Sequence, residues 1–256
     1  MVTIVLPFVI LFLNYFIPSG LMWLVEWCDF DFLRKYKIQP KRKNSGMKIV
    51  KATFYLLFIY FLVILPMYAV AFHFLTQIDY FSLEVSNIPN WKVLLLQLAF
   101  CFFMEDTAHY WFHRWLHTPW AYHVIHKIHH EFESPTILST SFAHPLEILI
   151  LGFATFLGPL LLRPHFLTLL IFVNLRQLAA CETHSGFDFP FSPNNLAPNL
   201  IGGADFHDFH HRRCSGVFSS NFMWWDIWCG TCGGFFEWKL KQQKKKLAES
   251  NKIHQE

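Results

Sequence analysis

Long apolar runs constrain this chain more than any other feature of its sequence. The first covers roughly residues 2–24 and the second about residues 53–75. Crossing the hydrocarbon of a bilayer takes about 20 apolar residues. Charged residues make up only 15% of the 256 residues, against about 25% in a typical soluble domain. We therefore expect an all-α integral membrane protein rather than an ordinary soluble enzyme.

Three shorter apolar stretches follow the first two runs. Residues 91–104 are too short to cross alone, so we expect this span to continue into the helix that carries the first histidines. Residues 145–162 and 165–180 are separated only by Arg163 and Pro164, which favours a membrane hairpin. The lengths of its arms leave open whether the hairpin crosses fully or is re-entrant. The sequence thus predicts about four to five membrane helices.

The distribution of basic residues predicts the orientation of these helices. Residues 34–51, between the first two runs, contain eight Lys and Arg side chains, whereas the next loop has only Lys92. Cytosolic loops carry an excess of Lys and Arg. We therefore expect the basic segment, the histidine-rich region and the Lys-rich tail (239–256) to be cytosolic. The formal net charge of +3 is too small to suggest nucleic acid as a partner.

Histidine is the most unusual residue, because 13 of the 15 histidines lie between His109 and His211. Three clusters have spacings that place imidazoles on one face of a helix. They are His109-x-x-x-His113, His126-x-x-His129-His130 and His207-x-x-His210-His211, and His184 follows the hairpin. A closed structural zinc site takes four ligands, so eight or nine imidazoles predict two metal ions. Imidazole binds Fe, Zn, Cu and Ni alike, so the spacing does not identify the metal.

Carboxylates lie beside these clusters, where ligating histidines commonly find hydrogen-bond acceptors. The candidates are Glu105, Asp106, Glu131, Asp188 and Asp208, with solvation at a helix end as the alternative. His73, His165 and His254 lie away from the clusters and are expected to be structural. The pair Cys229 and Cys232 has no second pair and no thioredoxin-like context, so we expect it to be structural or incidental.

The ordered histidine motifs on an apolar scaffold resemble the fatty acid hydroxylase/sterol desaturase superfamily, most closely its C4-methylsterol oxidase branch. The resemblance covers nearly the whole chain. The stretches that carry it are Glu105-Asp-Thr-Ala-His109-Tyr, Ile125-His-Lys-Ile-His-His-Glu-Phe132, Ala143-His-Pro-Leu-Glu147, His184-Ser-Gly-Phe-Asp188, Phe206-His-Asp-Phe-His-His211 and Trp224-Trp-Asp226.

The resemblance implies a protein of the endoplasmic reticulum membrane with a non-haem di-iron centre that uses O₂. Electrons would come from NAD(P)H, through cytochrome b5 or its reductase, and other sterol-processing enzymes are conceivable partners. The implied ligands are His109, His113, His126, His129, His130, His184, His207, His210 and His211. The resemblance also implies a metal or substrate-pocket role for His144, and His117 is a weaker candidate for such a role.

Three regions follow from this interpretation. Residues 1–104 form membrane anchor helices with a basic cytosolic loop. Residues 105–238 form the catalytic region, which includes the hairpin at 145–180 and a cytosolic helical cap that holds the two-metal site. Residues 239–256 form the cytosolic tail.

The expected activity is successive oxidation of a sterol C4 methyl group, through alcohol and aldehyde, to carboxylate. Two departures leave the substrate open: residues 137–142 lack the acidic residues of relatives, and Phe206 replaces the first histidine of the third motif. The alternative is a hydroxylase or desaturase of another sterol, a fatty acyl or a sphingoid lipid. A remote alternative is a metal-binding or transport protein, whose histidines should lie within the spans.

Overall fold

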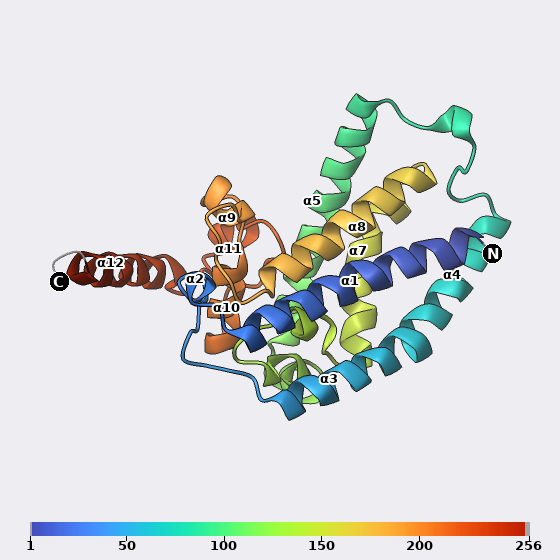
Figure 1. Cartoon of the computed structure of the whole chain (residues 1–256). Coiled ribbons are helices and arrows are strands. Elements are labelled where there is room, and N and C mark those ends of the chain that lie inside the picture. Colours follow the sequence, from blue (N-terminus) through green and yellow to red (C-terminus); the bar gives the residue numbers. More distant parts are fainter. Residues whose placement is uncertain (1, 254–256) are drawn as a thin grey trace.

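The computed structural model describes residues 2–253, with side chains described for residues 5–245 (Figure 1). Within these residues it is helical, and the only β-structure consists of the isolated bridges Lys37–Phe187 and Ile201–Phe222. This confirms the predicted all-α fold. The end of the predicted tail, with His254, lies outside the described residues.

Long helices form most of the fold. They are α1 (Val2–Cys28), α3 (Gly46–Ile59) with a π-helical turn (Tyr60–Ile64) and α4 (Leu65–Gln77), α5 (Trp91–Leu116), α7 (Pro145–Leu162), α8 (Phe166–Thr183) and α12 (Phe235–Ile253). Short elements connect them: α2 (Asp31–Arg34), η2 (Val85–Asn87), α6 (Pro119–Val124), η3 (His126–Glu131), η4 (Ile137–Ser141), α9 (Pro193–Leu196), α10 (Ala204–Arg213) and α11 (Trp224–Trp228).

Four helical segments among the described residues are long and apolar enough to cross a membrane. They are Val5–Cys28, Gly46–Gln77, Pro145–Leu162 and Phe166–Thr183. Both arms of the predicted hairpin are therefore candidate spans. The predicted third span is not, because polar residues from Glu105 onward limit the apolar part of α5 to residues 91–104.

Close contacts between small or polar residues hold these helices together. A Cβ atom at Gly158 of α7 would lie only 2.7 Å from the Cα atom of Cys101 in α5, so only glycine permits this approach. Between α1 and α8, the Asn14 side chain donates a hydrogen bond to Asn174. Small residues and interhelical hydrogen bonds commonly stabilise helix packing in membranes.

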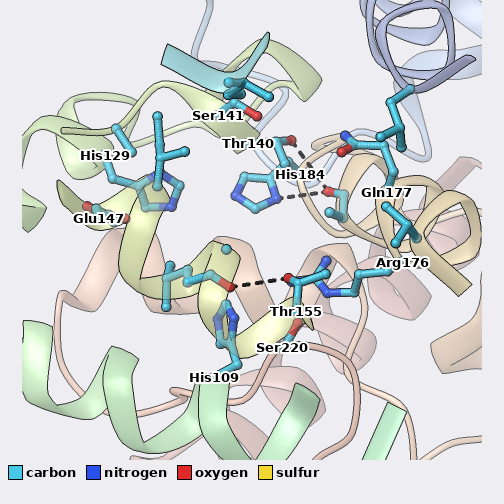
Figure 2. A pocket seen from close by; sticks show the side chains of 18 of the residues that line it. His109, His129, Thr140, Ser141, Glu147, Thr155, Arg176, Gln177, His184 and Ser220 are labelled. Carbon is cyan, nitrogen blue, oxygen red and sulfur yellow. Dashed lines mark hydrogen bonds between the residues drawn. The ribbon is translucent and has the colours of Figure 1, made fainter. Parts of the chain in front are cut away.

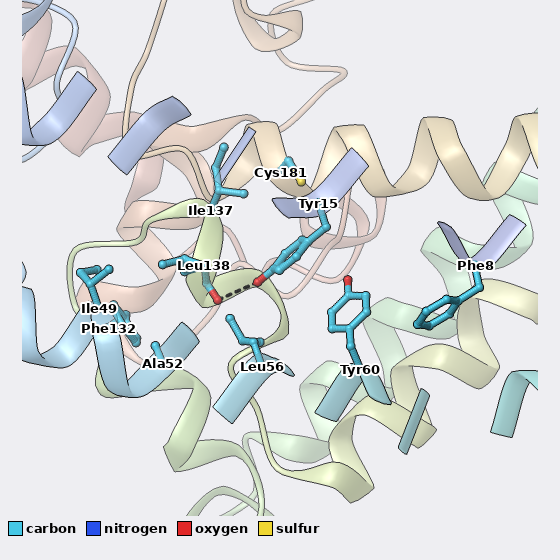
Figure 3. Packing of buried hydrophobic residues seen from close by; sticks show 10 residues of the cluster. All are labelled: Phe8, Tyr15, Ile49, Ala52, Leu56, Tyr60, Phe132, Ile137, Leu138 and Cys181. Atoms are coloured by element: carbon cyan, nitrogen blue, oxygen red, sulfur yellow. Dashed lines mark hydrogen bonds between the residues drawn. The ribbon is translucent and has the colours of Figure 1, made fainter. Parts of the chain in front are cut away.

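A cluster of buried residues joins the membrane helices to the segment that follows the second histidine motif (Figure 3). Tyr15 of α1 stacks on Tyr60, with ring centroids 5.3 Å apart, and its hydroxyl donates to the Leu138 carbonyl at 2.8 Å. Residues 137–142 begin with η4, and Ile137 and Leu138 are buried in this cluster. The stretch therefore has a packing role.

The two ends of the helical bundle contain different loops (Figure 1). At one end, the Phe166 amide donates to the Ser82 carbonyl at 3.0 Å, which ties the hairpin turn to the loop after α4. At the other end, the Gln39 amide donates to Asp208 at 2.7 Å, which ties the basic segment to the third histidine motif. The charge pattern predicted this grouping; the orientation in a membrane stays a prediction.

Candidate metal centre

Nine buried or half-buried histidines form two adjacent groups. The five-histidine group consists of His113 and His117 at the end of α5, His126 and His130 on η3, and His210 on α10. The four-histidine group consists of His129 on η3, His184 after α8, and His207 and His211 on α10. Within each group, one nitrogen of every imidazole lies within 4.8 Å of all the others.

The nitrogens in the five-histidine group are too closely spaced for hydrogen bonding alone. Nε2 of His126 lies 3.1 Å from Nε2 of His113, 3.0 Å from that of His117 and 3.1 Å from that of His130. A neutral imidazole has one N–H to donate, so these contacts cannot all be hydrogen bonds. Nitrogens bound at about 2.1 Å to one metal ion and at right angles would lie about 3.0 Å apart. The arrangement therefore fits a metal ion.

The four-histidine group also fits a metal ion. Nε2 of His211 lies 2.9 Å from Nε2 of His207, and the ring of His207 lies 4.0 Å from that of His184. Nε2 of His184 is buried and has no hydrogen-bond partner in the described part of the chain. A buried nitrogen without a partner is costly, and a metal ion would satisfy it.

Backbone carbonyls orient several of these rings by contacting the Nδ1 nitrogen. Nδ1 of His113 contacts the Phe218 carbonyl at 2.8 Å, and Nδ1 of His210 contacts that of Gly216 at 2.8 Å. His184 makes the same contact with Ala180 at 2.9 Å. A carbonyl only accepts, so each Nδ1 donates and each Nε2 keeps its lone pair for a metal.

Asp226 holds the loop that supplies two of these carbonyls. Its carboxylate accepts hydrogen bonds from the amides of Phe218 at 3.0 Å and Ser219 at 2.8 Å, and from the Thr231 hydroxyl at 2.6 Å. The Val217 amide also donates to the Thr231 carbonyl at 2.8 Å. Thr231 lies between the free cysteines Cys229 and Cys232, so this segment supports the loop through the hydroxyl and the carbonyl of Thr231.

Burial keeps the imidazoles neutral. Desolvation lowers the pKa of His113 to about 4, of His129 to about 3 and of His117 to about 2. It also lowers the pKa of His210 well below the ordinary value, and neighbouring imidazoles add to the effect. Neutral imidazole is the form that binds metals.

Two histidines differ from the expected ligand set. The structure places His117 within the five-histidine group, whereas His109 lies outside both groups and borders the adjoining cavity. The spacing could not separate them, because His109, His113 and His117 are each four residues apart on one face of α5. His144 also lies outside both groups, and its Nδ1 caps α7 by accepting from the Leu146 amide at 3.2 Å.

The structure of the second histidine motif also differs from the prediction, which placed His126, His129 and His130 on one face of a helix. The segment is a 3₁₀ helix, in which His126 and His130 join one group and His129 joins the other. Because η3 serves both groups, it fixes their separation. The α10 helix does the same, since His210 joins the first group while its neighbour His211 joins the second.

Among the five carboxylates predicted to support ligands, only Glu105 lies near a histidine nitrogen, 3.6 Å from Nδ1 of His109. Asp106 accepts from the amides of residues 221 and 222 and fixes that loop. Glu131 is exposed. Asp188 accepts from two asparagine side chains, and Asp208 accepts from Gln39.

One carboxylate that was not among the predicted candidates does contact a histidine of the five-histidine group. Oε1 of Glu147 lies 2.9 Å from Nδ1 of His126, and both side chains are almost fully buried. Glu147 lies in the first turn of α7, within the Ala143–Glu147 stretch that carries the resemblance. The resemblance drew attention to this stretch. The contact could not be predicted, because Glu147 lies outside the histidine clusters in the sequence.

A cavity of about 250 Å³ leads from the membrane helices to the histidines (Figure 2). Side chains from α1, α4 and α7, such as Phe8, Met67 and Leu151, make much of its wall apolar. His109, His129 and His184 border its other end. The shape and lining suit a lipid whose reacting atom lies next to the two histidine groups.

Comparison with known proteins agrees with this arrangement. A family model described as fatty acid hydroxylase matches residues 98–231. Methylsterol monooxygenase 1 of Gallus gallus is 39% identical over 218 residues, which cover 84% of this chain and 72% of the relative. Methylsterol monooxygenase 2-2 of Arabidopsis thaliana is 40% identical over 222 residues, 86% of this chain and 82% of the relative.

A third similar protein has a different activity in its name. Very-long-chain aldehyde decarbonylase GL1-11 of Oryza sativa subsp. indica is 40% identical over 233 residues, 90% of this chain and 85% of the relative. No solved structure matches the chain. The matched family region contains all nine grouped histidines, together with the whole of η3 and α10. The chain belongs to the fatty acid hydroxylase family.

Proposed function

We propose that this protein is a membrane-bound di-iron monooxygenase that oxidises a C4 methyl group of a sterol. Its family and its similarity to methylsterol monooxygenases support a membrane lipid oxidase. The observation that carries the proposal is the junction of two histidine groups with an apolar cavity between membrane helices.

The proposed ligands are the nine histidines of the two groups, each group holding one iron ion. Bound iron would supply the reduction of O₂ and the cleavage of an unactivated C–H bond, which acid–base side chains cannot perform. Each round converts one C–H bond to C–OH and consumes O₂, two electrons and two protons, with water as the second product. The first round would give the alcohol, the second a geminal diol that loses water to form the aldehyde, and the third the carboxylate.

The chain's own residues would position the lipid and protect the reaction. The apolar wall around Phe8 and Leu151 excludes water and holds the hydrocarbon body. The carbonyls behind His113, His184 and His210 fix the imidazoles in the tautomer that presents Nε2. These carbonyls belong to the protein backbone, so they would hold the ligating rings in a fixed orientation.

The membrane arrangement is part of the proposal. We place the protein in the endoplasmic reticulum membrane with the histidine groups and the C-terminus on the cytosolic side, as the basic segment at residues 34–51 suggests. A lipid substrate would enter from the bilayer. Electrons from NAD(P)H would arrive through cytochrome b5 or its reductase on the cytosolic side, where other sterol-processing enzymes could also bind.

Labelling with ¹⁸O₂ tests this function. The native chain, His210→Ala and the control His73→Ala would be expressed in separate membranes with NADH and cytochrome b5. The control removes an exposed histidine outside both groups. We expect label at C4 of a sterol with the native chain and the control, and none with His210→Ala at equal protein abundance. An intact di-iron centre without sterol labelling would refute the C4 assignment.

A second candidate is oxidation of an acyl lipid. The similarity to an aldehyde decarbonylase over 90% of this chain favours it. The same extracts distinguish the candidates. A hydroxylated fatty acyl or sphingoid lipid, a new double bond, or a hydrocarbon shortened by one carbon, present with the native chain and absent with His210→Ala, would favour this second function.

A further inference from the structure

A charged side chain lies in the wall of the otherwise largely apolar cavity. Arg176 belongs to the candidate span α8, and Figure 2 shows its side chain beside Gln177 and above Ser220 at the cavity. The side chain is only 14% exposed. An arginine within a membrane helix is costly and normally has a partner and a function.

One edge of this guanidinium is fixed by the protein. Nε of Arg176 donates to Oε1 of Glu105 at 2.6 Å, and Oε2 of Glu105 accepts from the Asn221 side chain at 3.0 Å. A guanidinium has five N–H donors in a planar fork. Within residues 5–245, no side chain or backbone group forms a hydrogen bond with Nη1 or Nη2 of Arg176. The anchored arginine therefore keeps free donors at the cavity.

These donors lie near the end of the cavity that the histidines border. The Glu105 oxygen that accepts from Arg176 is 3.6 Å from Nδ1 of His109, and His109 borders the cavity together with His129 and His184. The wall formed by α1 and α4 is apolar. The cavity thus suits a long apolar body with one hydrogen-bond acceptor placed next to the histidine groups.

We propose that Arg176 binds an oxygen atom of the substrate, and that the substrates are lipids oxidised within a few bonds of a hydroxyl or carbonyl group. This inference rests on the proposed function and narrows its substrate class. Glu105 already balances the charge of Arg176, so a neutral oxygen suits the site better than an anion. In a 4-methylsterol the 3-hydroxyl lies beside the reacting methyl group, whereas a methylene in the middle of an acyl chain has no such oxygen.

Equilibrium binding to the purified, metal-loaded full chain in detergent tests the proposal. One pair of probes is a 4-methylsterol and its 3-deoxy analogue; the other is octadecanal and octadecane. The variant is Arg176→Gln combined with Glu105→Gln, which removes the donor fork without leaving a buried charge. The control Arg163→Gln changes an arginine at the hairpin turn, whose guanidinium stacks on Tyr80.

The native chain and the control should bind the oxygen-bearing member of at least one pair about tenfold or more tighter than its deoxygenated partner. In the double variant this preference should disappear, while affinity for the deoxygenated probe stays within about twofold and the metal content is unchanged. Equal affinities for both members of both pairs in the native chain would overturn the proposal. A merely structural arginine would weaken both members equally, which would also overturn it.

Binding does not require turnover, so this result is independent of the function proposed above. A preference for oxygen-bearing probes that depends on Arg176, without oxidation of the sterol, would contradict the C4 oxidase function alone. Oxidation of the sterol by the native chain, without any such preference, would contradict the role of Arg176 alone.

Discussion

At the scale of single residues, the direction of each imidazole determines its role more than its spacing in the sequence. The series His109, His113 and His117 repeats every four residues, yet only the last two enter the five-histidine group. Spacing predicted that a face of α5 would carry ligands. It could not choose between adjacent turns, because that choice depends on where η3 and α10 meet the helix.

Exchanging these histidines singly tests the assignment. We expect His117→Ala to lower the bound metal from about two ions per chain toward one, because it removes a nitrogen from the five-histidine group. His109→Ala should retain both ions, since His109 lies outside the groups. Metal analysis of the purified variants measures this. A loss in His109→Ala with full retention in His117→Ala would reverse the assignment.

The contact between Glu147 and His126 gives a second prediction at this scale. We expect Glu147→Gln to weaken metal binding about 10–100-fold, the usual effect of changing a group that orients a ligating histidine. Glu131→Gln is the matched control, because Glu131 is exposed and lies next to His130 in sequence. Competition with a chelator measures both. Equal affinities in the two variants would show that the Glu147 contact does not support the site.

At the scale of elements, the membrane helices were far more predictable than the cap. Apolar runs at residues 2–24 and 53–75 predicted α1 and the continuous α3–α4 segment, because bilayer thickness fixes the length of such helices. The cap consists of short elements such as η3 and η4, whose conformations depend on tertiary contacts. The Tyr15–Leu138 hydrogen bond is one such contact between residues far apart in sequence.

The packing of α5 on α7 depends on a glycine. We expect Gly158→Ala to lower the free energy of unfolding by about 1–3 kcal/mol, because its Cβ would lie 2.7 Å from Cys101 backbone and the helices must separate. Gly152→Ala, in the same helix with no atom within 4 Å of its Cβ, should be neutral or stabilising. Thermal unfolding in detergent compares them. A stable Gly158→Ala protein would argue against this close packing.

At the scale of the whole molecule, contacts at the two ends of the bundle support one topology. The hairpin turn contacts the loop after α4, and the basic segment contacts the third histidine motif. The two segments of each pair must lie on the same side of the membrane, so the chain between them must cross the membrane an even number of times. For that reason α5 should complete a crossing, although its apolar part is short.

Cysteine labelling checks this topology in sealed endoplasmic reticulum vesicles. The background chain would have the four cysteines that are not buried, Cys28, Cys214, Cys229 and Cys232, replaced by serine. An impermeant maleimide should label Leu240→Cys in intact vesicles, but Val85→Cys only after detergent is added. Val85 lies between the second and third apolar runs, in the loop with few basic residues, which we expect on the lumenal side. Labelling of Val85→Cys in intact vesicles would invert or break the proposed arrangement.

The central claim is that the two histidine groups hold two iron ions beside a lipid cavity. The most direct measurement is the metal content and ⁵⁷Fe Mössbauer spectrum of the active, purified full chain. We predict about two irons per chain, coupled to each other, because the groups share η3 and α10. Full activity with a single iron, or with zinc filling both groups, would contradict the account.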